Sequence, residues 1–326
     1  MILAGDIGGT KTQLALCELR EGPRVDVVLE RRFDNAGYAG FEQVLDAFLA
    51  DAGAARGSMP RVGRAGFSVA GPVEQGRCRL TNLDWEIDGS RLASRFGFDV
   101  AEVLNDFAAS ATGIDALEPG DLVTLQAGEP VAGAPRVVLG AGTGLGVAHL
   151  FWDGSGYRVS PGEGGHAGFA PSSDEQAALW ASIHRAKGRV EIEDVLSGPG
   201  LERIHEFFAE GGAATGLAVR APEIAASALG GDYASQRALD LFIAAYGAVA
   251  GDLALGVLAR GGVYVAGGIA PKILPRLAAG GFVAAFNAKN RFADVARRVP
   301  VHVVTNERLP VLGAALAAAR HPPSGE

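Results

Sequence analysis

The sequence predicts an α/β protein built from two lobes. Segments with strand and helix periodicity alternate along the chain, and two glycine-and-threonine hairpins of similar outline lie about 135 residues apart. The 326 residues, 48% of them hydrophobic, are enough for two cores. The alternation favours mostly parallel sheets. The repeated hairpin favours a duplicated architecture, in which each lobe offers backbone amides to one nucleotide.

In the first part of the chain, apolar periodicity predicts short elements separated by glycine-containing turns. Strands are expected at residues 2–4, 13–17, 62–69 and 100–104, and helices at 41–49, 90–96 and from 107 onward.

The second part repeats this pattern and adds a longer helix, for which Asp232 is the expected cap. Strands are expected at residues 137–140, 145–151, 262–266 and 301–304, and helices at 175–185, 199–208, 222–229, 235–259, from 271 onward and at 312–319. Residues 322–325 are expected to form a frayed tail.

The charge and the distribution of apolar residues disfavour two classes of binding partner, nucleic acid and membrane. Twenty-nine basic against 37 acidic residues give a formal charge of −8, and no basic run is long enough to follow a nucleic-acid backbone, so nucleic acid is disfavoured. No stretch approaches a membrane span and the first residues lack a signal-peptide pattern, which favours a cytoplasmic protein without membrane contact. Cys17 and Cys78 are expected to be buried core residues.

The opening loop, Gly-Asp-Ile-Gly-Gly-Thr-Lys-Thr at residues 5–12, nearly matches a Walker motif. Thr10 occupies the position of the glycine that must precede Lys11, and a strand pattern follows instead of a helix, so the loop is predicted to join two strands. Its glycines let amides approach an anion, and the carboxylate of Asp6 could reach a phosphate-bound magnesium ion directly or through water. An ordinary glycine-rich turn is the alternative interpretation.

Two further glycine clusters follow predicted strands. From Gly140 to Gly146 a glycine stands at every second position, so the G-x-G-x-x-G fingerprint of nicotinamide enzymes is absent. Gly267 and Gly268 follow a buried strand, where a flat group could approach the backbone, although such junctions are common.

Polar side chains at three other places are candidates for ligand binding. Asn105 and Asp106 stand where a strand ends and a helix begins, although such a pair in isolation is usually a simple helix cap. Glu163 and His166 share a segment with three glycines, which suits a polyhydroxylated ligand better than a zinc ion. Glu193 precedes another glycine-rich corner, and a solvated carboxylate is its alternative interpretation.

Taken together, these motifs resemble those of the bacterial glucokinases, in the superfamily of actin, sugar kinases and chaperone ATPases. The resemblance runs nearly end to end, and its last two motifs are the most specific for glucokinases. The matching segments are residues 5–10 (first phosphate motif), 104–107 (catalytic segment), 140–146 (second phosphate motif), 265–269 (adenosine motif), 161–166 and 196–200.

This resemblance implies a two-lobed actin-like ATPase fold of the ribonuclease H-like type. A small α/β domain would comprise residues 1–115 plus 306–326, and a larger α/β domain residues 116–305, with the active site in the cleft between them. The implied activity is transfer of the γ-phosphoryl group of ATP to the 6-hydroxyl of glucose with Mg²⁺, in a cytoplasmic homodimer.

The resemblance also assigns the site residues. Asp106 would be the catalytic base, and Asp6 would serve magnesium directly or through water. The residues assigned to the sugar are Asn105, Asp106, Glu163, His166 and Glu193, and those assigned to the nucleotide are Gly5, Asp6, Ile7, Gly8, Gly9, Thr10, Gly142, Thr143, Gly144, Gly267 and Gly268.

One departure concerns Lys11, where close relatives commonly carry Asn. A related group of repressors and kinases has Gly-Gly-Thr-Lys here, but that group has a cysteine-rich zinc site beside its sugar-binding histidine. This chain has no cysteine near His166, so a repressor is disfavoured. The role of Lys11 stays open, as do the breadth of sugar specificity and the choice between ATP and polyphosphate.

Two other functions remain as alternatives. A kinase of the same fold could act on fructose, N-acetylmannosamine or a carboxylate. A nucleotide-driven switch ATPase would leave Glu163, His166 and Glu193 without a role.

Overall fold

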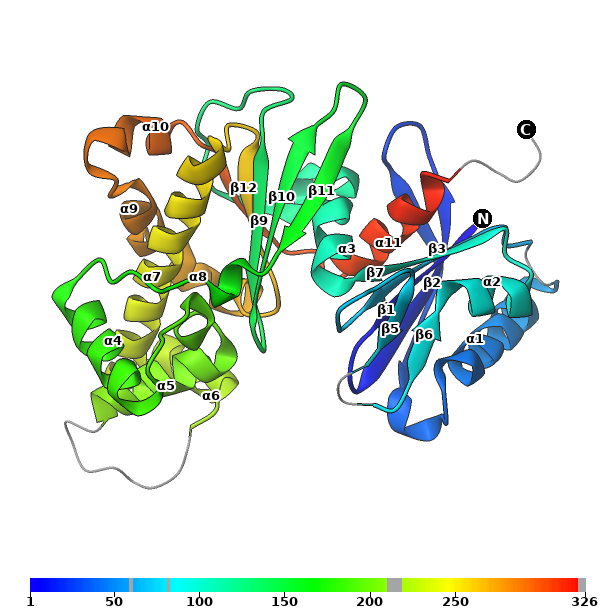
Figure 1. Cartoon of the computed structure of the whole chain (residues 1–326), viewed down its shortest axis with the longest axis horizontal. Coiled ribbons are helices and arrows are strands. Elements are labelled where there is room, and N and C mark those ends of the chain that lie inside the picture. Colours follow the sequence, from blue (N-terminus) through cyan, green and yellow to red (C-terminus); the bar gives the residue numbers. More distant parts are fainter. Residues whose placement is uncertain (59–60, 81–82, 210–218, 322–326) are drawn as a thin grey trace. The chain divides into compact units, whose positions relative to one another are not determined.

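The computed structural model describes residues 1–58, 61–80, 83–209 and 219–321, so the tail expected at 322–325 lies outside the described residues. The chain divides into two compact units, and each contains its own mixed sheet and helices (Figure 1). Unit 1 comprises Met1–Pro119 and Asn306–Glu326, and unit 2 comprises Gly120–Thr305.

Unit 1 is built on a five-stranded sheet of order β3-β2-β1-β4-β7. β1 pairs antiparallel with β2 and parallel with β4, which pairs parallel with β7. The elements of this unit are β1 (Ile2–Ile7), β2 (Lys11–Leu19), β3 (Val25–Asp34), α1 (Phe41–Arg56), β4 (Arg64–Val69), β5 (Arg77–Arg79), β6 (Glu86–Asp88), α2 (Gly89–Phe96), β7 (Val100–Asn105), α3 (Asp106–Gly113) and α11 (Leu309–Ala319).

Helices cover both faces of this sheet because successive residues of its buried strands point to opposite sides. Leu3 and Ile7 of β1 join the core that contains Phe41 and Phe48 of α1, whereas Ile2 and Ala4 of the same strand pack against α11. Both cysteines are buried and unpaired, which confirms their expected place in the core.

Small residues allow α3 and α11 to pack with their backbones in contact. A methyl group on Gly313 of α11 would lie 1.7 Å from the carbonyl oxygen of Ala109 in α3, and one on Gly113 of α3 would lie 2.4 Å from that of Leu309. The alanine-rich sequence of the last helix and its Gly313 therefore reflect a close contact with α3, whose first residue is Asp106.

Unit 2 is built on a six-stranded sheet of order β11-β10-β9-β12-β13-β8. β9 lies at its centre, antiparallel to β10 and parallel to β12. The elements of this unit are β8 (Leu122–Gln126), β9 (Arg136–Ala141), β10 (Leu145–Trp152), β11 (Tyr157–Gly162), α4 (Asp174–Lys187), α5 (Gly198–Ala209), α6 (Ala221–Leu229), α7 (Tyr233–Val257), β12 (Gly262–Ala266), α8 (Leu274–Leu277), α9 (Gly281–Asn287), α10 (Ala293–Arg297) and β13 (Val301–Val304).

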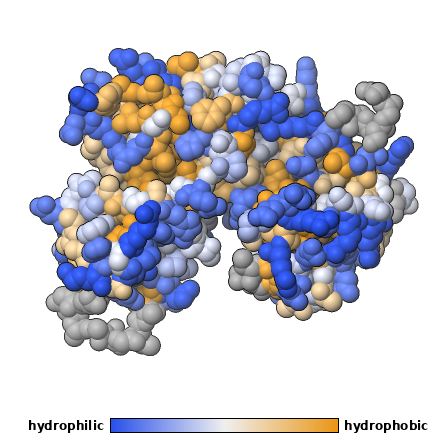
Figure 2. Space-filling view, in the orientation of Figure 1, coloured by the Kyte–Doolittle hydropathy of each residue, from blue (hydrophilic) through white to orange (hydrophobic). Residues whose placement is uncertain are grey.

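The long helix α7 forms much of the core of unit 2. Asp232 caps it as predicted, because its side chain accepts a hydrogen bond from the amide of Ser235 at 2.8 Å. Among the described residues, α7 is the single helix long and apolar enough to cross a membrane, but 72% of its most apolar window is buried inside the protein, as in a core helix. In Figure 2, hydrophobic residues gather over part of α7 and hydrophilic residues cover much of the remaining surface of the face shown.

The structure corrects three expectations about secondary structure. The sheets are mixed, not mostly parallel, because hairpins add antiparallel strands to a parallel centre. The sequence patterns missed β3, β5, β6, β8 and β11, and also the short helices α9 and α10. The helix expected from residue 271 is a 3₁₀ turn, Ala270–Ile273, followed by the one-turn helix α8, because Pro275 lacks the amide that would continue a helix begun at residue 271.

Candidate active site

The first phosphate motif forms a tight turn between antiparallel strands, as its failure to match a Walker motif predicts. β1 ends at Ile7, which pairs with Thr12 of β2, and the amide of Gly8 donates to the carbonyl oxygen of Lys11 at 3.0 Å. A turn of this kind offers backbone amides from a hairpin instead of from the start of a helix.

A buried asparagine that sequence reasoning missed holds this turn. The Asn35 amide nitrogen donates to the carbonyl oxygen of Gly8 at 2.9 Å, and its side-chain oxygen accepts from the Thr12 hydroxyl at 2.8 Å. The Asn35 backbone amide donates to the carbonyl oxygen of Thr10 at 2.9 Å. Because Thr12 and Asn35 are both buried, these bonds hold the turn firmly. The sequence contains no local signal that connects residue 35 to residues 8–12.

Asp6 is a carboxylate in a poorly solvated place. It pairs in register with Ser68 of the parallel neighbour β4, and the Ser68 hydroxyl donates to its Oδ1 at 2.7 Å. The pKa of Asp6 is raised to about 6: burial is the largest cause, the Ser68 hydrogen bond opposes it, and the charge of Asp106 adds to the increase. A divalent cation would relieve this cost of ionisation with a hard oxygen ligand, so the residue fits the expected magnesium site.

Asn105 and Asp106 occupy the junction of β7 and α3. The Asn105 side chain accepts from the amides of Phe107 and Ala108 at 2.9 and 3.2 Å, and it donates to the carbonyl oxygen of Gly71 at 3.2 Å. Asn105 therefore caps the helix, as the alternative interpretation expected. Asp106 is exposed in the first turn, where its Oδ1 accepts from the amide of Phe107 at 2.8 Å.

The second phosphate motif is the turn between β9 and β10. The amide of Gly142 donates to the carbonyl oxygen of Gly144 at 2.8 Å, and Thr143 is exposed at the tip. The carbonyl oxygen of Gly142 accepts from the amide of Gly198, where α5 begins, at 2.8 Å. A methyl group on Gly142 would meet no atom within 4 Å, so this backbone is open to a ligand.

Glu193 lies against this same turn. Its Oε2 accepts from the amide of Leu145 at 2.7 Å, and a methyl group on Gly144 would lie 2.3 Å from that oxygen. Glycine at position 144 is therefore required for the carboxylate to approach the turn. The structure thus joins a residue assigned to the sugar directly to a motif assigned to the nucleotide.

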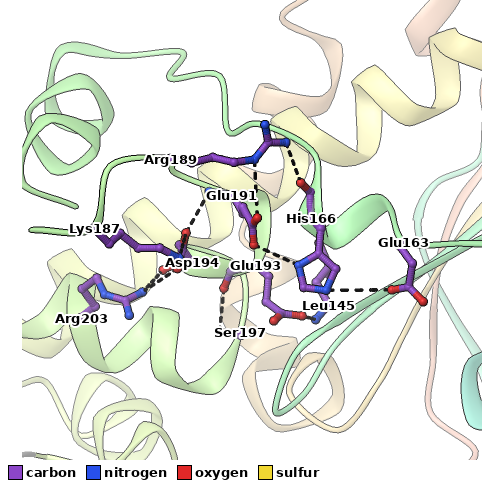
Figure 3. A network of polar contacts seen from close by, with 10 residues as sticks. All are labelled: Leu145, Glu163, His166, Lys187, Arg189, Glu191, Glu193, Asp194, Ser197 and Arg203. Carbon is purple, nitrogen blue, oxygen red and sulfur yellow. Dashed lines mark hydrogen bonds and ion pairs between the residues drawn. The ribbon is translucent and has the colours of Figure 1, made fainter. Parts of the chain in front are cut away.

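Glu163 and His166 lie close to Glu193 in unit 2, and the His166 ring stands between Glu163 and Glu191 (Figure 3). His166 Nε2 is 4.0 Å from Glu163 Oε2, and the Glu163 side chain is 91% exposed, which leaves its carboxylate accessible to a ligand. Two of the three glycines in this segment are needed for close packing. Methyl groups on Gly164 and Gly165 would lie 2.9 Å from the Val147 side chain and 2.4 Å from the Leu145 carbonyl oxygen, so the segment packs closely on β10.

The glycine pair after β12 lies beside the second phosphate motif. Gly267 has a φ of 82°, and a methyl group there would lie 2.6 Å from the Ala141 carbonyl oxygen. A methyl group on Gly268 would meet no atom within 4 Å. Gly267 is thus needed for packing, and Gly268 leaves the backbone approachable.

The candidate residues therefore fall into two groups, one in each unit. Unit 1 brings the β1–β2 turn and Asp6 near Asp106, whose charge acts on Asp6. Unit 2 brings together the β9–β10 turn, residues 267–268 and the side chains of Glu163, His166 and Glu193. Within the described residues, no group of three or more His, Cys, Asp or Glu side chains could hold a metal ion alone.

Comparisons with known proteins give the family and the fold of this chain. A family model described as glucokinase matches residues 3–321. A glucokinase of Nostoc sp. is 39% identical over 98% of this chain and 99% of its own length. The crystal structure of a glucokinase from an Antarctic psychrotroph covers 98% of this chain and 99% of its own, with a TM-score of 0.89 and 31% identity.

A more distant structure shares the fold. It is a ROK family glucokinase from Streptomyces griseus in complex with glucose and AMPPNP, with a TM-score of 0.63 and 21% identity over 98% of this chain and 99% of its own. The end-to-end match to the family model and the identity with curated relatives show that this chain belongs to the glucokinase family, the ATP-dependent hexose kinases.

Proposed function

We propose that the chain transfers the γ-phosphoryl group of ATP to the 6-hydroxyl of glucose and that Asp106 takes the proton from that hydroxyl. The observation that carries this assignment is the position of Asp106 in the first turn of α3, exposed and near the buried carboxylate of Asp6. Asn105 holds the start of the helix, so its cap also orients Asp106. A carboxylate so placed can accept a proton as the hydroxyl attacks phosphorus.

Asp6 and Asp106 differ in environment, and this difference supports separate roles. Asp6 is poorly solvated and bonded to Ser68, which suits a residue that contacts a cation. Asp106 is exposed and accessible to a substrate hydroxyl. Magnesium, when bound with ATP, would neutralise charge on the phosphate oxygens, and Asp6 would hold it directly or through water.

The sugar is proposed to bind through Glu163, His166 and Glu193 of unit 2 with Asn105 and Asp106 of unit 1. Carboxylates accept hydrogen bonds from hydroxyl groups, and an imidazole can donate or accept them. The turns at residues 5–10 and 142–144, with residues 267–268, supply backbone amides for the nucleotide. The reaction therefore requires residues of both units, which correspond in this proposal to the two lobes of an actin-like kinase.

The near-isosteric substitution Asp106→Asn tests the base directly. We expect kcat to fall about 10²- to 10⁴-fold in a coupled assay for glucose 6-phosphate, because the base is lost, whereas glucose binding measured by calorimetry persists. Asp51→Asn, which removes an exposed carboxylate on α1 of the same unit, is the matched control and should keep wild-type turnover. Wild-type kcat in the Asp106→Asn enzyme would show that the base is wrongly assigned.

Specificity and assembly are the remaining parts of the proposal. Turnover with glucose should exceed turnover with fructose or N-acetylmannosamine, and ATP should exceed polyphosphate as donor, in parallel assays. We further propose a cytoplasmic homodimer, supported by the family resemblance and by the exposed apolar side chains Leu258 and Phe292 of unit 2. Light scattering of the purified chain at micromolar concentration measures the assembly directly.

A further inference from the structure

His166 has a carboxylate partner that the family motifs do not include. Its Nδ1 lies 3.0 Å from Oε2 of Glu191, two residues before Glu193, whereas its Nε2 has Glu163 Oε2 at 4.0 Å (Figure 3). The two ring nitrogens therefore have different surroundings. Nδ1 forms a hydrogen bond within the chain, and Nε2 lies on the side of the exposed Glu163 carboxylate.

Backbone pairing fixes the distance between the segments that carry these two residues. The amide of Phe169 donates to the carbonyl oxygen of Val190 at 3.1 Å, and the amide of Ile192 donates to that of Ala167 at 2.9 Å. The His166–Glu191 contact thus joins two segments that are held together at an isolated β-bridge between Gly168 and Glu191.

Glu191 is also held from its other side. Arg189 Nε lies 3.5 Å from Glu191 Oε1, and Arg189 Nη2 donates to the His166 carbonyl oxygen at 3.0 Å. The Glu191 amide donates to Oδ2 of Asp194 at 2.8 Å, and Lys187 forms an ion pair with Asp194 at 2.7 Å. Both the backbone and the carboxylate group of Glu191 are therefore held in place.

We propose that Glu191 is a positioning residue, which keeps the proton of neutral His166 on Nδ1 and thereby presents Nε2 to a hydroxyl of the sugar. A carboxylate can only accept a hydrogen bond, so Nδ1, which is hydrogen-bonded to Glu191, must carry the proton. Nε2 is 4.0 Å from the Glu163 carboxylate, which is too far for a hydrogen bond. Nε2 is then the acceptor in the neutral ring and a donor in the charged ring. The inference rests on the proposed placement of His166 in the sugar site.

The charges around the ring agree with this arrangement. Glu191, Glu193 and Glu163 all face His166, and Arg189 contacts its carbonyl oxygen. The hydrogen bond to Glu191 is the largest cause that raises the pKa of His166, partial burial opposes it, and the charges of all three glutamates add to the increase. The same hydrogen bond lowers the pKa of Glu191. The hydrogen bond thus stabilises the charged pair as well as the orientation.

Two variants of the full chain test this role. Glu191→Gln keeps the shape and removes the charge, and Glu191→Leu removes the acceptor. The matched control is Glu175→Gln, an exposed carboxylate of α4 that pairs with Arg237 in the same unit. ¹⁵N-labelled histidine allows NMR to report the tautomer and titration of His166, which is assigned among the six histidines by its absence from His166→Gln.

We expect the wild-type ring to carry its neutral-state proton on Nδ1, and both Glu191 variants to titrate at lower pH than the wild type. Glu191→Leu should also transfer part of the neutral population to the Nε2 tautomer. Glucose KM should rise about three- to tenfold, with kcat within about a factor of two, because a hydrogen bond to substrate is weakened and the base is untouched. The pH at which KM changes should move down together with the NMR titration.

Three results would overturn the inference. An unchanged tautomer and titration of His166 in both variants would show that Glu191 does not set the state of the ring. Changed spectra with wild-type KM would show that the state of the ring does not matter for the sugar. An unaltered KM in His166→Ala would remove His166 from the proposed sugar site, and the NMR results would still report separately on the contact with Glu191.

Discussion

Asp6→Asn is expected to make the protein more stable and less active at the same time. The substitution preserves the size of the side chain and leaves an oxygen that can accept the Ser68 hydrogen bond. It removes the charge that the folded state solvates poorly. A residue whose charge costs stability has a functional reason to be present, and for Asp6 that reason is proposed to be magnesium.

The magnitude follows from the proton affinity of the folded state. The ordinary pKa of an aspartic carboxyl is 3.8, and burial, the largest cause, raises the pKa of Asp6 to about 6. Each tenfold difference in proton affinity corresponds to about 1.4 kcal/mol, so ionised Asp6 costs the folded state up to about 3 kcal/mol relative to the unfolded chain. Between pH 3.8 and about 6 the folded state binds more protons than the unfolded state, so stability falls as the pH rises through this window.

Calorimetric melting of the wild type and Asp6→Asn at pH 8 and pH 4 measures this difference. At pH 8 the variant should melt about 5–10 °C higher in the transition of unit 1, and at pH 4 most of the gap should close because folded wild-type Asp6 is then protonated and no longer carries the unfavourable charge. Mg²⁺ with ADP should stabilise the wild type more than the variant. Glu21→Gln, an exposed carboxylate in the turn after β2, is the matched control and should leave the melting profile unchanged.

Equal melting temperatures of the wild type and Asp6→Asn at pH 8 would refute the argument that burial opposes the charge. An equal gain at pH 4 and pH 8 would refute its assignment to ionisation. Wild-type turnover of Asp6→Asn at every magnesium concentration in a titration would show that Asp6 does not hold the cation, whatever the effect of the substitution on stability.

The remaining predictions concern packing and the first turn. Asn35→Ala should destabilise unit 1 by about 1–3 kcal/mol and raise the KM for ATP, because it leaves the Gly8 carbonyl and the Thr12 hydroxyl without their partner. Denaturant unfolding and initial rates measure these two effects, and unaltered values would contradict the role of Asn35 in holding the turn. Gly313→Ala should destabilise by about 1–3 kcal/mol through the clash with α3. Gly256→Ala, where the added methyl group meets no atom within 4 Å in α7, should instead be neutral or stabilise by up to about 1 kcal/mol. Equal changes in melting temperature for the two glycine variants would show that the contact between α3 and α11 does not cause the loss of stability.

Much of the fold could be predicted because its signals are local. Buried helices such as α1 show apolar residues at helical spacing, and the central strands β1 and β12 show short apolar runs that end in glycine. The turn at residues 8–10 was predictable because a hairpin and a helix cradle require glycine at different positions. The helix start at Asp106 was predictable because Asn105 is a good capping residue.

The edge strands were less predictable, since they carry polar side chains and irregular composition. β11 includes Pro161 and Gly162, which indicate a loop, yet an edge strand tolerates them because one of its sides needs no hydrogen bonds from a neighbour. β3 mixes charged and apolar residues without regular alternation, and it is partly exposed along its length. The mixed character of both sheets comes from the hairpin pairs β1–β2 and β9–β10, and β3 and β11 add further antiparallel pairs at the edges.

The motifs, the family and the side chains available for chemistry could be recognised from the sequence, because these depend on residue types at short spacing. The groups that support the motifs became visible in the folded structure: Asn35 on the first turn, Ser68 on Asp6, Gly198 on the second turn and Glu191 on His166. These partners come from distant parts of the chain: Glu191 lies 25 positions from His166, and Ser68 lies 62 positions from Asp6. Such a hydrogen bond depends on the pairing of distant segments, which no local pattern of residues specifies.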